Sequence, residues 1–191
     1  FIGSEGTLGI ITATTLRLMP RPREMGAAVF AVDSPEAAIR LLSLAQDRLG
    51  EAISAFELIG RQGPDFLMEV GPETRMPLDP VPDWMVLIDL GLSGEGRAEE
   101  ALAALFEAAM EAGLVTDGVL ASSEAQRAEF WALRENIPAA NRRVGAVSSH
   151  DISVPVGAIP EFIAKGGPAI AQIGQFRINC FGHVGDGNLH Y

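Results

Sequence analysis

The chain has 191 residues, of which 48% are hydrophobic and 20% are charged. This length and composition are typical of one folded domain with a substantial core, and they exclude a wholly disordered chain. The 14 Lys and Arg residues against 25 Asp and Glu residues give a net charge of −11. Such a surface repels phosphate backbones, so we expect no nucleic-acid partner.

Along the chain, apolar β-prone stretches alternate with helical patterns. We expect strands at residues 25–32, 53–59, 84–90, 115–120, 149–154 and 176–181. Helices are expected at residues 34–50, 64–70, 95–112, 123–138 and 159–173. Pro138 is expected to end the fourth helix, and Gly166-Gly167-Pro168 to interrupt the fifth. Residues 71–82 hold four prolines and predict a surface loop.

This alternation is compatible with two fold classes. A doubly wound parallel sheet would need longer, near-continuous apolar strands that are buried on both faces. Because the predicted strands are short, we favour an α+β fold of ferredoxin-like type, with an antiparallel sheet covered by helices on one face.

The single cysteine, Cys180, cannot form an internal disulfide, which fits a reducing compartment. The apolar stretches are far shorter than the roughly 20 residues that a membrane helix needs. We therefore expect a cytoplasmic protein without a transmembrane segment. The first residue is Phe1 and the last, Tyr191, directly follows a dense polar motif, so we expect a fragment of a longer chain.

That polar motif runs from His183 to His190. Asp186-Gly187 is a strong signal for a two-residue hairpin turn, which would place His183 directly opposite His190 with Cβ atoms about 5 Å apart. Two imidazoles so placed can bind one metal ion, with a third ligand expected beyond Tyr191. The alternative is a hairpin with two solvated histidines.

Four segments together resemble one family, the FAD-linked 2-hydroxy-acid dehydrogenases, which include D-lactate dehydrogenase, D-2-hydroxyglutarate dehydrogenase and the glycolate oxidase D subunit. These segments are residues 1–20, 131–135, 150–155 and 181–190. The resemblance implies that residues 1–22 are the tail of an FAD-binding domain. Residues 23–191 would be most of the substrate-binding cap domain, truncated at its C-terminus.

By similarity, the glycine-rich segment at the start of the chain would line the FAD site, with the candidate residues Gly3, Ser4, Glu5, Gly6, Thr7 and Gly9. The resemblance also implies that His183 and His190 hold a divalent metal ion, Zn or Mn, with a downstream glutamate as third ligand.

Arg134 and Asn188 are the predicted catalytic residues. The guanidinium of Arg134 offers a planar, two-pronged donor set that matches a substrate carboxylate. The alternative for Arg134 is a surface side chain paired with an acid such as Glu135. Arg127 lies on the same helix face and would assist it or be solvated, and Trp131 between them is expected in the core.

The resemblance places a lysine near the position of Ser149 in the hydroxyglutarate branch, where it would bind a second carboxylate. Ser149 cannot do this, which favours a monocarboxylate such as D-lactate. We therefore expect the whole protein to oxidise a small D-2-hydroxy acid by hydride transfer to FAD.

Two alternatives stay open. One is a different FAD-linked oxidase that acts on an alcohol, a phenol or an ether-lipid precursor. The other concerns the isolated chain, which without the rest of its FAD domain is expected to be an inactive binding module that self-associates.

Overall fold

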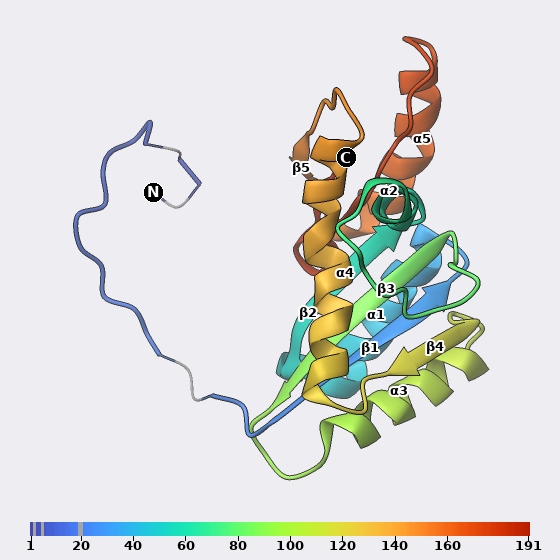
Figure 1. The fold of residues 1–191 in the computed structure, drawn as a ribbon. Coiled ribbons are helices and arrows are strands. Elements are labelled where there is room, and N and C mark those ends of the chain that lie inside the picture. The colour runs from blue at the N-terminus through green and yellow to red at the C-terminus, as the bar shows by residue number, and fades with distance from the viewer. Residues whose placement is uncertain (2, 5, 19–20) are drawn as a thin grey trace.

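The computed structural model of the chain describes all residues except 2, 5, 19 and 20. The described residues before Glu24 form no helix or strand, and they are largely exposed. Figure 1 shows this N-terminal segment standing clear of the helices and strands that make up the rest of the chain.

The described residues from Glu24 on form one sheet, whose strands differ in length, together with helices. Its strands are β1 (Glu24–Val32), β2 (Ile53–Gly60), β3 (Trp84–Leu92), β4 (Asp117–Leu120), β5 (Asp151–Ser153), β6 (Phe181–His183) and β7 (Asn188–His190). Their order is β4-β1-β3-β2-β6-β7-β5, and every neighbouring pair is antiparallel. The antiparallel sheet confirms the α+β prediction and excludes the doubly wound alternative.

The helices are α1 (Pro35–Leu49), α2 (Gln62–Val70), α3 (Ala98–Glu111), α4 (Glu124–Arg143) and α5 (Ile159–Ala171). Two of them begin at the expected serine caps. The Ser34 side chain accepts a hydrogen bond from the amide of Ala37, and Ser123 accepts one from the amide of Gln126.

Helices cover both faces of the sheet, so the expectation of a single covered face was wrong. Side chains of α2 and α4, including Leu133, pack with Ile59 and Leu87 on one face. On the other face, α1 and α3 pack with Phe30 and Ile88. Figure 1 shows α4 crossing in front of the sheet and α1 behind it. The reason is that β1 and β3 are apolar at successive residues, and both faces of such strands must be buried.

Three element boundaries also differ from the sequence prediction. Helix α4 continues past Pro138. Proline removes one helical hydrogen bond, but Ile137 and Ala140 on either side of it are fully buried, and this burial outweighs the lost bond. Helix α5 runs unbroken through Gly166, where a Cβ would lie 2.8 Å from the Tyr191 hydroxyl oxygen. The last predicted strand was placed too early, since residues 176–180 are not in a strand and β6 begins at Phe181.

Candidate functional site

The histidine motif does not form the two-residue hairpin that its sequence predicts. Residues Val184–Asp186 form a short 3-10 helix, and Gly187 follows with a φ of 83°. A Cβ at Gly187 would lie 2.1 Å from the Val154 carbonyl oxygen, so the turn requires glycine here. Because this turn is longer, His190 pairs with Phe181 and not with His183.

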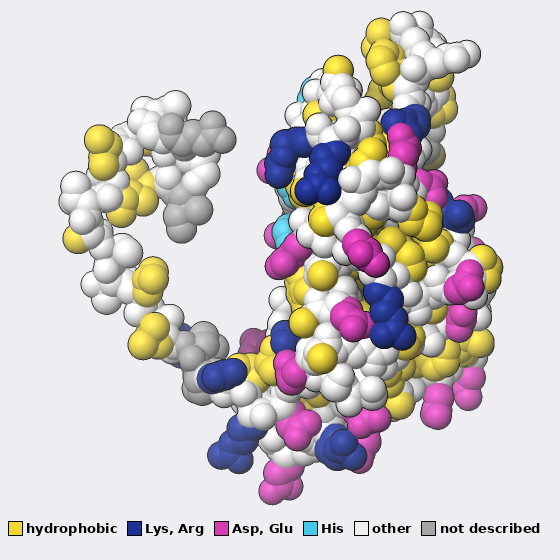
Figure 2. All heavy atoms as spheres, in the orientation of Figure 1, with side chains coloured by type: hydrophobic (Ala, Val, Ile, Leu, Met, Phe, Trp, Pro, Cys, Tyr) yellow, Lys and Arg dark blue, Asp and Glu magenta, His cyan; other side chains and the backbone are white. Residues whose placement is uncertain are grey.

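The two histidines nevertheless share one face of the sheet. His183 lies two residues after Phe181 on β6, and alternate residues of a strand point to the same side. The Phe181 ring stacks on the His190 ring with centroids 5.0 Å apart. Figure 2 shows cyan histidine side chains at the left edge of the main body of the molecule, near a group of Lys and Arg side chains.

Glu57 is the residue of this site that sequence reasoning missed. It lies on β2 opposite His183 and is 0% exposed. Its Oε2 atom accepts a hydrogen bond of 2.7 Å from Arg134 Nε, and its Oε1 atom contacts His183 Nδ1. One buried carboxylate therefore joins two of the predicted functional side chains.

Arg134 is directed inward from α4 and pairs with Glu57, so the alternative of a surface arginine paired with Glu135 was wrong. Its side chain is only 9% exposed, and its guanidinium lies 4.6 Å from the centre of the Phe181 ring. Within the described residues, its terminal nitrogens Nη1 and Nη2 form no hydrogen bond, and neither is a fully buried unpartnered atom. They remain available to a ligand.

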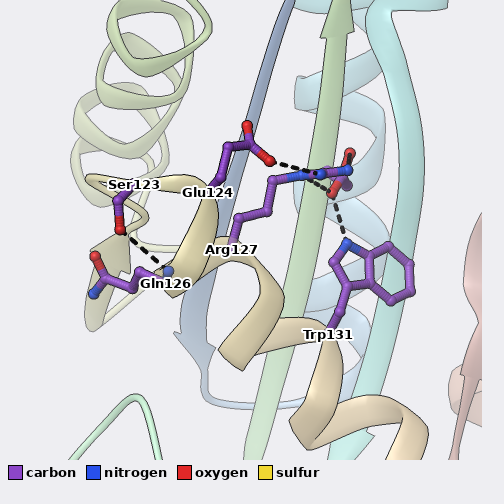
Figure 3. Close-up of polar contacts among 6 residues, drawn as sticks. Ser123, Glu124, Gln126, Arg127 and Trp131 are labelled. Atoms are coloured by element: carbon purple, nitrogen blue, oxygen red, sulfur yellow. Dashed lines mark hydrogen bonds and ion pairs between the residues drawn. The ribbon is translucent and has the colours of Figure 1, made fainter.

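Arg127 takes part in a second buried pair, drawn in Figure 3. Its Nε and Nη2 donate to the two carboxylate oxygens of Asp89 at 2.8 and 3.1 Å, and its Nη1 donates to Glu124 at 3.3 Å. The indole nitrogen of Trp131 donates to the same Asp89 at 2.7 Å. The hydrogen bond with Asp89 raises the pKa of Arg127, against the effect of burial. Arg127 is thus a partly exposed side chain whose three guanidinium nitrogens all have a partner within the protein.

His190 and Asn188 face the short edge strand β5. His190 Nδ1 lies 3.9 Å from Asp151 Oδ1, while the Asn188 amide donates to the same Asp151 oxygen at 2.6 Å and to the Ile152 carbonyl at 3.2 Å. Burial, and next the positive charge of Arg134, lower the pKa of His190. Both effects favour the neutral imidazole. The catalytic role of Asn188 stays a prediction, and its amide nitrogen is engaged within the sheet.

The metal prediction fits this geometry in part. The Glu57 carboxylate occupies His183 Nδ1 and leaves Nε2, on a side chain that is 51% exposed. Histidine ligands usually hold their second ring nitrogen against a carboxylate in this way. However, the described part of the chain contains no cluster of three or more His, Cys, Asp or Glu residues able to hold a metal ion. His183 and His190 would supply two ligands only.

The predicted FAD residues lie in the N-terminal segment, and Glu5 is outside the described residues. Gly3 and Gly6 adopt positive φ angles of 80° and 81°, and nothing lies within 4 Å of where their Cβ atoms would be. Ser4 and Thr7 donate to backbone carbonyls three residues earlier, while Gly9 is exposed. The FAD role of these residues stays a prediction.

Two hollows border the site. One, of about 350 Å³, is lined by Phe181, His190, Ser149 and His150 together with apolar side chains of α5 and the segment after it. The other, of about 540 Å³, includes Glu57 and His183 in its lining. Glu57 and the two histidines therefore each line one of these hollows, whereas Arg134 lines neither of the two.

Cys180 precedes Phe181 in the sequence but is not a candidate nucleophile. It is 4% exposed, and burial raises the pKa of its thiol to about 12. A thiol with that pKa is protonated at neutral pH and is a structural side chain.

The fold and the cluster define an α+β domain with a buried carboxylate that links an arginine to a histidine. Residues 21–191 match the family described as "FAD linked oxidases, C-terminal domain", and the chain belongs to this family. The match confirms the resemblance and includes three of the four segments that carried it, residues 131–135, 150–155 and 181–190.

The whole chain is also similar to curated proteins. It is 35% identical over 192 residues to the probable mitochondrial D-2-hydroxyglutarate dehydrogenase of Oryza sativa subsp. indica, covering 100% of this chain and 34% of that protein. It is 34% identical over 190 residues to the mitochondrial D-2-hydroxyglutarate dehydrogenase of Arabidopsis thaliana, with the same coverage. The D-2-hydroxyglutarate dehydrogenase of Stutzerimonas stutzeri (strain A1501) is 35% identical over 191 residues, 100% of this chain and 40% of that protein.

The chain thus spans about a third of the length of the curated relatives it matches. Within the described residues, no helix is both long and apolar enough to cross a membrane. The cytoplasmic location, the domain boundary at residue 22 and self-association stay predictions.

Proposed function

We propose that this chain is part of a flavin-dependent dehydrogenase that oxidises a D-2-hydroxy acid to the corresponding 2-oxo acid. The observation that carries the proposal is that Nη1 and Nη2 of Arg134 have no hydrogen-bond partner among the described residues, while Arg134 shares the Glu57 carboxylate with His183. The relatives named as D-2-hydroxyglutarate dehydrogenases support the same reaction class.

In this proposal, Arg134 binds the substrate carboxylate through Nη1 and Nη2. A guanidinium presents two parallel N–H groups that match the two oxygens of a carboxylate. Glu57 and the Phe181 ring hold the guanidinium from the opposite edge and from one face. This orients the 2-hydroxyl end of the substrate toward the histidines.

The neutral imidazole of His190 has a lone pair that accepts a hydrogen bond or binds a metal ion. A divalent metal held by His183 and His190 would lower the pKa of the 2-hydroxyl group, and FAD would supply the acceptor for the hydride from C2. His183 and His190 would contribute two of the metal ligands, and the part of the chain that the structure describes offers no third.

For the substrate side chain, we propose a small monocarboxylate such as D-lactate. Ser149 lines the 350 Å³ hollow and carries no charge to pair with a second carboxylate. D-2-hydroxyglutarate is the second candidate, because the relatives carry that name and because Arg177 lines the same hollow, although it pairs with Glu69.

The test is a visible spectrum of the full-length protein under anaerobic conditions, recorded before and after D-lactate, L-lactate or D-2-hydroxyglutarate is added. We expect the D forms alone to bleach the flavin, and D-lactate to act at lower concentration than D-2-hydroxyglutarate. The reverse order would reject the monocarboxylate and keep the reaction class. A full-length protein that contains no flavin, or a flavin that responds to none of the three, would contradict the proposal.

An alternative is an FAD-linked oxidase that acts on an alcohol or a phenol. Such a substrate has no carboxylate and would leave the free edge of Arg134 unused. Bleaching by a simple alcohol, with no response to any 2-hydroxy acid, would favour this alternative.

A further inference from the structure

Glu57 is the feature of this site that neither the motif nor the resemblance assigns. It is a single carboxylate with 0% exposure in the middle of an apolar strand. Each of its two oxygens contacts a different functional candidate, Arg134 through Oε2 and His183 through Oε1. Both partners come from distant parts of the chain, helix α4 and strand β6.

We propose that Glu57 is a positioning residue that fixes the His183 tautomer and the Arg134 orientation at the same time. This role rests on the proposed function, in which His183 and Arg134 take part in the oxidation of a 2-hydroxy acid. It extends that function by assigning a residue that holds the binding groups without itself touching the substrate.

The His183 part follows from hydrogen-bond chemistry. A carboxylate only accepts hydrogen bonds, so the nitrogen that contacts Glu57 Oε1 must carry the proton. In its neutral form, His183 is then the Nδ1–H tautomer, and the lone pair on Nε2 is directed away from Glu57. Since half of this side chain is exposed, Nε2 is the nitrogen that a ligand can reach.

The Arg134 part follows from geometry. A guanidinium has five N–H donors in one plane. Glu57 engages Nε at 2.7 Å, and the Phe181 ring lies 4.6 Å from the guanidinium carbon. These two contacts fix the edge and the plane of the group and leave Nη1 and Nη2 without a partner among the described residues. A carboxylate at another position would take that pair and block the substrate.

The chain contains a matched control. Asp89 is also a buried carboxylate, it lies on β3 next to β2, and it also pairs with an arginine of α4. Its partners are Arg127 and Trp131, and it touches neither histidine. A general effect of removing a buried carboxylate should therefore appear in both Glu57→Gln and Asp89→Asn, whereas an effect of positioning should appear only in the first.

The first measurement needs no substitution at Glu57. The full-length protein, labelled with ¹⁵N at histidine and prepared without added metal, is examined by long-range proton–nitrogen correlation NMR at neutral pH. The His183 signals are assigned by their loss in His183→Gln. We expect a protonated Nδ1 and an unprotonated Nε2, and a protonated Nε2 would overturn the proposal.

The second measurement compares Glu57→Gln with Asp89→Asn. We expect Glu57→Gln to change the His183 tautomer signals and to lower kcat/KM for the D-2-hydroxy acid by about 10- to 100-fold, the range known for groups that orient metal-binding histidines. Asp89→Asn should leave the His183 signals and kcat/KM unchanged. Equal losses of kcat/KM in both variants, with His183 unaltered, would overturn the proposal.

Failure of the proposed function gives a different result. If the wild-type protein oxidises no 2-hydroxy acid but His183 still shows the Nδ1–H tautomer and loses it in Glu57→Gln, the positioning role stands and the reaction is wrong. If Glu57→Gln does not fold, the tautomer of the wild-type protein alone decides.

Discussion

Two buried ion pairs on helix α4 differ in what they leave unsatisfied. Arg127 and Arg134 both reach carboxylates on the sheet that are 1% and 0% exposed, respectively Asp89 and Glu57. In the first pair, both carboxylate oxygens and three arginine nitrogens have partners within the protein. In the second pair, the Glu57 carboxylate also contacts His183, and two guanidinium nitrogens of Arg134 have no hydrogen-bond partner among the described residues.

The comparison teaches that pairing of an arginine with a buried carboxylate does not by itself indicate a binding site. An arginine whose three nitrogens all have partners in the protein stabilises the fold, and one with unpartnered nitrogens can also bind a ligand. We call Arg127–Asp89 the closed pair and Arg134–Glu57 the open pair. The closed pair therefore contributes to stability, and the open pair to function.

The largest expected effect is on the stability of the closed pair. Asp89→Ala leaves Arg127 and the Trp131 indole without their acceptor, and we expect the free energy of unfolding to fall by about 3 kcal/mol. Chemical denaturation followed by circular dichroism measures it. A loss below about 0.5 kcal/mol, the size of an ordinary surface substitution, would show that the pair is not structural.

The next effect concerns the open pair. Arg134→Lys keeps the charge but loses the two-pronged donor set, and we expect KM for the D-2-hydroxy acid to rise about 30-fold, or about 2 kcal/mol. Steady-state kinetics of the full-length protein measures this. The matched control is Arg127→Lys, whose KM should equal that of the wild type. If the two variants behave alike, the distinction between open and closed pairs fails.

The turn that sets the register of His190 has an effect of similar or smaller size. Gly187→Ala places a Cβ against the Val154 carbonyl at a positive φ, and we expect a cost of about 1–2 kcal/mol in the free energy of unfolding. Gly185→Ala is the control, since nothing lies within 4 Å of its Cβ position and no positive φ is involved. Equal melting temperatures for the two variants would contradict the described turn.

The smallest effect is expected at Phe181, whose ring contacts both Arg134 and His190. Phe181→Leu keeps a buried apolar side chain but removes the cation–π contact, which is worth about 0.5–1 kcal/mol. We expect a rise of KM by about 2- to 5-fold, in line with that energy. An unchanged KM would show that Glu57 alone orients the guanidinium.

Local sequence signals predicted much of the fold. Ser34 and Ser123 begin their helices as expected because a cap depends on residues three positions away. Pro138 misled the prediction, because the burial of Ile137 and Ala140 outweighs one lost hydrogen bond. The prediction of a two-residue turn at Asp186-Gly187 was also wrong. Val184 is fully buried, and residues Val184–Asp186 form a 3-10 helix in place of the hairpin strand.

The candidate site was predicted only in part. Arg134, His183 and His190 were identified from their motifs, and the structure brings all three to one face of the sheet. Glu57 was missed because its partners are 77 and 126 residues away, beyond any local pattern. Its one sequence signal is a charged residue inside the apolar run from Phe56 to Ile59, where a buried carboxylate requires a partner.

The most direct test of the open pair is anaerobic flavin reduction by a D-2-hydroxy acid in the full-length wild-type protein, in Arg134→Lys and in Arg127→Lys. We expect the wild type and Arg127→Lys to bleach at the same substrate concentration, and Arg134→Lys to require about 30-fold more, as for loss of about 2 kcal/mol of binding. Identical titrations for all three proteins would show that Arg134 does not bind the substrate carboxylate.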